Sequence, residues 1–278
     1  MRHIALTVDV DRDVNMVRKG STAAVSSPLA GSDQPRFDSS AEGLQRIIAV
    51  LHRENVRGTF FLEGRTAEVL AERMDLATLL AGQEVAAHGY DHEDFAGADD
   101  GRQMNGEETN GALDRCGKAL DHIFGAGRRG FRAPYMRSTP WLGAALAERM
   151  YLYESSEYME LRQGRIRPYP GTNGLVQVPV AVGRDAQGKK IFGYLWPLHE
   201  GQRPLEDYLA LMDSFEDGLL VLATHSWHLV ECFASGRLEE EACRRSQEDL
   251  RTMIDHAKAS GMEFTTVRGH LASERGGC

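Results

Sequence analysis

The 278-residue sequence lacks several features that would place it in a common class of protein. It has no run of about 18 apolar residues, so no transmembrane helix is expected. It has no excess of basic residues, because 32 Lys and Arg against 41 Asp and Glu give a formal net charge of −9. That charge argues against an unassisted surface for nucleic acid or an anionic membrane. The first apolar segment is not followed by a glycine-rich dinucleotide fingerprint.

Cysteines are few, and they lack metal or redox spacing. The four positions are Cys116, Cys232, Cys243 and Cys278. We interpret them as free thiols in a reducing compartment, and the sequence leaves open the alternative that two of them form a disulfide. Met1 leads directly into an apolar segment, without a basic leader, an apolar signal region or a cleavage site. Together these features predict a cytoplasmic protein.

The chain is long enough to bury one sizeable core, and we expect a single catalytic domain over residues 1–278. Apolar segments of strand length alternate with segments of helical spacing, which predicts a parallel sheet with right-handed crossovers. Two intervals depart from this alternation. Residues 13–38 form a long polar loop, typical of a lid, a binding loop or disorder, and residues 151–198 form an irregular insertion. The letters SSAE at 39–42 predict a capping box.

The first apolar segment ends in two acids, in the motif TVDVD at 7–11. Residues two apart in a strand point to the same side, so Asp9 and Asp11 can converge on one site. Adjacent carboxylates repel each other, and apolar surroundings raise the free energy of keeping both ionised, a penalty that a cation removes. The alternative is that these acids cap a helix or form a turn.

A histidine pair favours the metal interpretation. His88 and His92 belong to the motif HGYDH, which follows another short apolar segment. Residues four apart share one face of a helical turn and can bind one divalent ion. Two histidines, one carboxylate and an open position describe a catalytic site for zinc, or for iron or another divalent ion.

Two further predicted strand ends carry polar side chains. The motif FRAPY contains Arg132, Pro134 and Tyr135, and the motif LATH ends in His225. Taken alone, these residues are also consistent with a surface ion pair, a turn and a buried core histidine. The C-terminal ends of barrel strands surround one mouth, where catalytic sites are usually built. We therefore expect a distorted (β/α) barrel of seven or eight parallel strands, with the active site at those ends, in preference to an open doubly wound sheet.

The joint order of the motifs TVDVD, TFF, HGYDH, FRAPY and LATH resembles that of polysaccharide deacetylases. These are the carbohydrate esterase family 4 enzymes with a NodB-type homology domain. The resemblance extends from about residue 1 to residue 268. It implies that Asp9 is the catalytic base and that a divalent metal, zinc first and iron, cobalt, nickel or manganese as alternatives, is held by Asp11, His88 and His92.

The same resemblance implies roles for the remaining motif residues. Arg132 matches the arginine that holds the base, and the backbone N–H of Tyr135 matches the oxyanion donor. His225 matches the general acid, although His228 lies three residues further on and competes for that role. The residues expected to contact the substrate are Trp227 and Pro134.

Three departures from the family pattern affect the sugar-binding surface more than the metal. Val10 stands where most members have a second consecutive Asp, and Asp11 is shifted by one residue, as in an Asp-x-Asp subgroup. Gly89 stands where many members have a Ser or Thr that braces the loop. The sequence contains no Asp-x-x-x-Trp, so the usual aromatic wall and the carboxylate partner of the acid histidine are unassigned.

These observations predict a metal-dependent hydrolase that removes an acetyl or formyl group from the nitrogen of an amino sugar or glycan. One alternative is a cyclic imide or ureide amidohydrolase on the same barrel. A second is a non-catalytic carbohydrate-binding relative. No nucleic-acid partner is expected, and the sequence leaves the oligomeric state open.

Overall fold

The structure is a computed structural model that describes residues 1–12, 15–17, 20, 22, 24–26, 34–98, 101–171, 174–233 and 235–276. Much of the predicted loop at 13–38 lies outside the described residues, as does Cys278. Within that loop, β2 (Asn15–Val17) pairs with β3 (Ala24–Ser26) in an antiparallel hairpin. Among the helices that can be described, none is both long and apolar enough to cross a bilayer.

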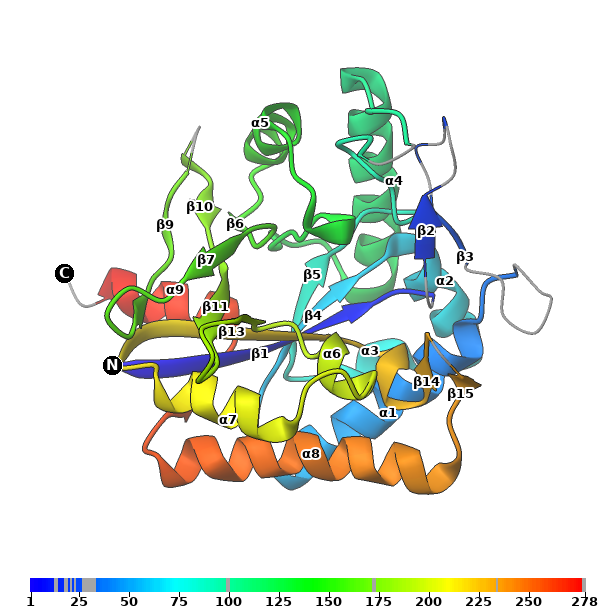
Figure 1. Ribbon diagram of the computed structural model, residues 1–278. Coiled ribbons are helices and arrows are strands. Elements are labelled where there is room, and N and C mark those ends of the chain that lie inside the picture. Colours follow the sequence, from blue (N-terminus) through cyan, green and yellow to red (C-terminus); the bar gives the residue numbers. More distant parts are fainter. Residues whose placement is uncertain are drawn as a thin grey trace.

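A parallel sheet forms the centre of the molecule (Figure 1). Its two longest strands are buried almost throughout, which explains why both appear in the sequence as continuous apolar runs. The hydrogen-bonded order is β5 (Glu84–Ala87), β4 (Thr59–Leu62), β1 (Arg2–Val10), β13 (Asp217–His225) and β8 (Arg165–Ile166), with β16 (Glu263–Phe264) paired to the start of β1.

Short strands and single bridges extend this sheet into a distorted ring, in which β6 and β7 follow each other along the chain without pairing in the described part of the structure. Phe131 bridges both Ala87 of β5 and Glu154 of β6. The chain then enters β7, which pairs in parallel with β11. Tyr194 bridges Ala223, which returns the ring to β13. The short strands are β6 (Tyr153–Glu154), β7 (Tyr158–Glu160), β9 (Tyr169–Pro170), β10 (Val176–Gln177), β11 (Val180–Arg184), β12 (Lys190–Phe192), β14 (Glu231–Cys232) and β15 (Gly236–Arg237).

The predicted distorted barrel is therefore confirmed as a fold class. The distortion arises because single residues, and not complete strands, make several of the links. The interval 151–198, predicted to be irregular, contributes the short strands from β6 to β12 and forms one side of the ring.

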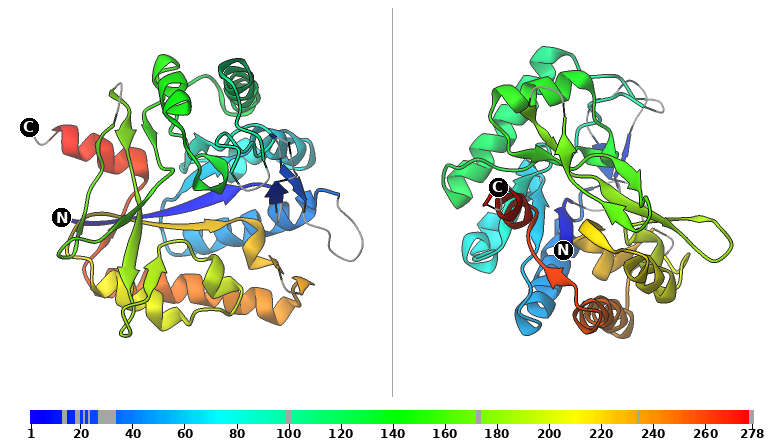
Figure 2. Two further views of the ribbon diagram at one scale, coloured as in Figure 1. Left: turned by 45° about the horizontal axis from the view of Figure 1, so that its top comes forward. Right: turned by 90° about the vertical axis from the view of Figure 1, so that its left-hand side faces the viewer.

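Helices cover the outside of the ring, as the two further views show (Figure 2). α1 packs on α8, which also contacts α7, and α4 packs between α2 and α5. Their bounds are α1 (Phe37–Arg53), α2 (Gly64–Arg73), α3 (Leu76–Leu79), α4 (Gly106–Phe124), α5 (Pro140–Glu148), α6 (Trp196–His199), α7 (Leu205–Asp213), α8 (Glu240–Ala259) and α9 (Val267–Gly276).

The start of α1 differs from the prediction. The helix begins at Phe37 without a side-chain cap, so the capping box predicted at 39–42 is wrong. Ser39 and Ser40 are instead buried in the first turn. The hydroxyl of Ser40 lies 2.6 Å from that of Ser226, which follows β13. These serines therefore attach the helix to the sheet and do not cap it.

Candidate active site

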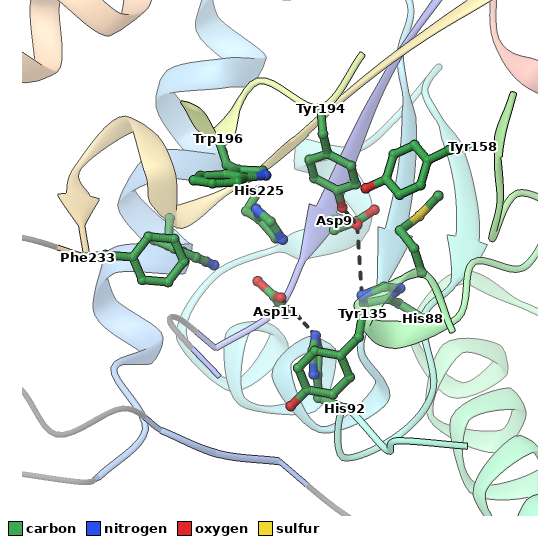
Figure 3. A pocket seen from close by; sticks show the side chains of 12 residues that line it. Asp9, Asp11, His88, His92, Tyr135, Tyr158, Tyr194, Trp196, His225 and Phe233 are labelled. Atoms are coloured by element: carbon green, nitrogen blue, oxygen red, sulfur yellow. Dashed lines mark hydrogen bonds and ion pairs between the residues drawn. The ribbon is translucent and has the colours of Figure 1, made fainter. Parts of the chain in front are cut away.

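All the predicted functional side chains except those of Arg132 and Pro134 line one cavity of about 280 Å³ (Figure 3). It lies where β1, β5 and β13 end, because Asp9 and His225 are register partners in adjacent parallel strands and His88 directly follows β5. The lining residues are Asp9, Asp11, His88, His92, Tyr135, Met136, Tyr158, Tyr194, Trp196, His225, Trp227 and Phe233.

Asp9 is a buried carboxylate held by two donors. Arg132 donates from Nη1 to Oδ1 at 2.8 Å, and the Tyr194 hydroxyl donates to Oδ2. Burial favours the neutral form of Asp9, but the charge of Arg132 leads the opposing interactions. The pKa of Asp9 consequently lies below its ordinary value. Asp9 is therefore ionised at neutral pH, and its orientation is fixed.

Arg132 is completely buried, and each of its nitrogens donates a hydrogen bond. Nε donates to the Ser155 carbonyl at 3.0 Å, Nη2 to the Ser155 hydroxyl at 3.1 Å, and Nη1 also to the Thr7 hydroxyl at 2.9 Å. The guanidinium lies 4.2 Å from the centre of the Phe61 ring. This combination of a planar fork and ring stacking is specific to arginine.

Asp11, His88 and His92 form a buried cluster in which one ligand atom from each lies within 4.8 Å of the others. The Nδ1–H of His88 donates to the Arg132 carbonyl at 2.9 Å, which leaves the lone pair on Nε2. Nε2 of His92 lies 3.3 Å from Oδ2 of Asp11.

Asp11 lacks the pairing that Asp9 has. Its Oδ1 is buried without a hydrogen-bond partner among the described residues. Burial raises the pKa of Asp11 to about 6. A divalent cation would neutralise this carboxylate and occupy its unpaired oxygen, so the donor set fits a metal such as zinc.

An irregular loop brings the two histidines together, so the predicted helical turn at 88–92 is wrong. Gly89 and His92 have φ values of 73° and 50°. A Cβ at Gly89 would lie 2.7 Å from Oε2 of Glu93, which accepts the Tyr90 N–H at 2.9 Å. The Glu93 carboxylate thus braces the loop from within, and glycine leaves room for it.

Tyr135 and Pro134 lie in the short 3-10 helix η1 (Pro134–Met136). Tyr135 lines the cavity, with its ring edge-on to His92 at a centroid distance of 4.6 Å. Its φ of 57° is uncommon for a bulky residue. Pro134, predicted to contact substrate, is buried beside Gly89 and is not among the residues that line the cavity.

The last residue of β13, His225, reaches the cavity. Its ring stacks on Trp227 with centroids 5.3 Å apart, and Trp227 lines the cavity at the position predicted for a wall. His228 is fully buried and does not line the cavity. Of the two histidines considered for the acid, only His225 is placed to meet a substrate.

Sequence reasoning missed the aromatic side chains that enclose the cavity. Tyr158, Tyr194 and Trp196 come from the irregular interval 151–198, and Phe233 comes from the turn after β14. None of them belongs to a motif. The only signal was the presence of aromatic residues in a segment without periodicity.

Comparison with known proteins gives concordant results. A sequence profile described as polysaccharide deacetylase matches residues 35–150. A peptidoglycan deacetylase-like protein from Gibberella zeae is 28% identical over 116 residues, which are 41% of this chain and 32% of that protein. The match thus spans about a third of that relative's length.

Solved structures share the fold over nearly the whole chain. A putative polysaccharide deacetylase from Mycobacterium smegmatis has a TM-score of 0.57 and 24% identity, covering 95% of this chain and 93% of that one. A carbohydrate esterase family 4 pseudoenzyme from Bacillus anthracis has a TM-score of 0.56 and 16% identity, covering 97% and 65%. The profile spans His88, His92 and Arg132, so the predicted resemblance to polysaccharide deacetylases is confirmed for this part of the chain, and the solved structures share the fold along nearly all of it.

Proposed function

We propose that this protein is a metal-dependent hydrolase that removes an N-acyl group, acetyl or formyl, from an amino sugar or glycan. One observation carries the proposal. The ionised Asp9, held by Arg132, lies beside the Asp11, His88 and His92 cluster in the cavity that His225 also lines.

The side chains divide two proton transfers between them. Asp9 accepts a proton from water as the water oxygen bonds to the amide carbon. His225 donates a proton to the amide nitrogen as the C–N bond breaks, so that a neutral amine leaves. A divalent cation at the cluster would polarise the carbonyl and lower the pKa of the attacking water. The backbone N–H of Tyr135 is assigned to the developing oxyanion.

The cavity walls bear on the size of the substrate. The aromatic side chains of Tyr158, Tyr194, Trp196 and Phe233 form much of the wall of the cavity, whose volume of about 280 Å³ gives room for one ring with its acyl group. We therefore place a single acylated residue of the substrate in the cavity. The same flat, largely apolar walls favour a cyclic imide as the second candidate substrate.

The Bacillus anthracis relative is described as a pseudoenzyme, so the non-catalytic alternative needs an answer. In this chain the proposed base, its arginine, the three proposed ligands and the proposed acid are all present and gathered at one site. This complete set favours a catalyst. The cytoplasmic location stays a prediction from the sequence.

A metal and substrate panel tests the proposal. The protein is stripped of metal and reloaded separately with zinc, cobalt, nickel, manganese and iron(II). Release of acetate or formate is then measured with N-acetylglucosamine, its oligomers and N-formyl amino sugars, and ring opening is measured with cyclic imides. We expect acyl release that requires metal. His88→Ala should lose metal and turnover, and loaded wild-type protein without acyl release on any substrate would refute the proposal.

A further inference from the structure

The histidine assigned as general acid has a buried polar partner behind it. Nδ1 of His225 lies 3.1 Å from Nδ1 of His228. On the other side of that ring, Nε2 of His228 lies 3.3 Å from Oε1 of Glu200. Both His228 and the Glu200 side chain are withdrawn from solvent, with exposed fractions of 0% and 2%. The three side chains therefore form a line that leads from the cavity into the protein.

The donor inventory fixes where each hydrogen lies along this line. Oε1 of Glu200 accepts the Phe233 N–H, so this oxygen is an acceptor, and Nε2 of His228 is assigned the hydrogen that it donates to Oε1. Burial lowers the pKa of His228 well below its usual value, so the ring is neutral and its Nδ1 is an acceptor. Nδ1 of His225 must then be the donor. Nε2 of His225 is left as the nitrogen that serves the cavity.

Packing holds the ring of His228, the middle member of the line, in this arrangement. The ring of His228 lies against Trp227 at a centroid distance of 3.7 Å and stacks with His199 at 5.6 Å. Glu200 is fixed as well, because its Oε1 also accepts the Phe233 N–H at 2.7 Å. The ring edges are thus the parts of His228 that meet polar groups.

We propose that His228 and Glu200 form a positioning relay that sets the ring orientation and tautomer of His225. This inference rests on the proposed function, because it assigns to His225 the proton that the leaving amine receives. His225 acts as the acid in its imidazolium form, in which both ring nitrogens carry a hydrogen. The proton on Nε2 passes to the amide nitrogen as the C–N bond breaks, and the ring is left as the neutral Nδ1–H tautomer, still bonded to His228. Glu200 is thus the carboxylate partner that could not be assigned from the sequence, and His228 lies between it and the proposed acid, His225.

The relay predicts a dependence on the leaving group. An amide requires a proton on its nitrogen before the amine can leave, whereas the 4-nitrophenolate of 4-nitrophenyl acetate leaves without one. Misorienting His225 should therefore impair amide cleavage selectively. General damage to the cavity or to the metal site should impair both substrates together.

Three variants separate these cases. His228→Phe keeps the packed ring and removes both polar edges, and we expect kcat for the amide to fall about 100-fold, at the lower end of a general acid's contribution. Its ester hydrolysis should stay near the wild-type rate. His228→Asn retains an acceptor for His225 and should recover part of the amide activity. His199→Phe is the matched control, because His199 packs on the same ring but bonds Thr224, and it should resemble wild type.

A second measurement does not depend on turnover. Nitrogen-15 NMR of the histidine side chains reports which ring nitrogen carries the hydrogen. In wild type, at a pH at which His225 is neutral, its ring should be the Nδ1–H tautomer, and this preference should disappear in His228→Phe. The relay is wrong if wild type shows the Nε2–H tautomer, or if His228→Phe loses amide and ester activity equally. A wild-type enzyme inactive on every amide but with the expected tautomer would overturn the proposed function and leave the relay supported.

Discussion

Replacing Asp9 or Asp11 by asparagine should change the stability of the metal-free protein in opposite directions. The two carboxylates are equally buried, lie two residues apart, and undergo nearly isosteric substitutions. Their partners differ. Asp9 is bonded to Arg132, whereas Oδ1 of Asp11 has no hydrogen-bond partner within the described part of the chain. Each variant therefore serves as the control for the other.

The magnitude for Asp11 follows from its pKa. A rise from 3.8 to about 6 makes the ionised form unfavourable by about 3 kcal/mol in the metal-free fold. Because the pKa of Asp11 is raised in the folded state, this loss of folding free energy is absent below pH 3.8 and complete above pH 6. Asp11→Asn avoids the charge but buries an amide, which costs about 1–3 kcal/mol. The net gain at pH 7.5 should be about 1 kcal/mol and should disappear as the pH falls toward 4.

The Asp9 variant has the opposite sign. The folded pKa of Asp9 is depressed, so this carboxylate stabilises the fold above its ordinary pKa and ceases to do so in acid. Asp9→Asn leaves the buried Arg132 without its counter-charge, and losing one partner of a buried pair costs about 3–5 kcal/mol.

Thermal unfolding of chelated protein at pH 7.5 and pH 5 measures both effects. At roughly 2–4 °C per kcal/mol, the Asp11 variant should unfold a few degrees above wild type and the Asp9 variant at least about 6 °C below it. Adding zinc should stabilise wild type and Asp9→Asn but not Asp11→Asn. The reasoning fails if the two metal-free variants shift in the same direction.

Three further changes test single features of the site. Gly89→Ser and Gly82→Ser both place a side chain at positive φ, which costs roughly 1–2 kcal/mol, but only the serine at position 89 would meet neighbouring atoms. Gly89→Ser should therefore show the lower Tm and the weaker zinc binding of the two variants. Equal losses in both variants would contradict the bracing role of Glu93. Tyr194→Phe removes a donor that lowers the pKa of Asp9, so the acidic limb of the kcat/KM profile should move to higher pH, and an unmoved limb counts against the contact. Arg132→Lys cannot reproduce the guanidinium fork, and kcat should fall about 100-fold for a misplaced base; near-normal turnover would exclude a positioning role.

The chemistry-bearing residues could be predicted because they lie at the ends of regular elements. β1 and β13 are long apolar runs, so Asp9 and His225 were recognisable as strand ends, and parallel strands bring such ends together. The structure places them in one cavity. Their individual roles stay predictions until activity is measured.

The remainder of the site could not be predicted because it lies in segments without periodicity. A spacing of four suggested a helical turn for His88 and His92, but the positive φ at Gly89 turns the chain into a loop. Tyr194 joins the sheet through a single bridge, which leaves no alternating pattern in the sequence. Glu200 lies 28 residues before His228, and no local signal connects them.

The pairing of β1 with β13 has a consequence for how the site opens. The ladder extends from Arg2 with Gly218 to Asp9 with His225, so the two residues proposed to transfer protons end the most extensive ladder of the described strands. The aromatic wall is attached to strands of two or three residues, such as β7 and β12. Local opening has a lower free energy in such segments, so amide hydrogens there should exchange first. Substrate can then enter by displacement of the wall while the distance between the proposed base and the proposed acid stays constant.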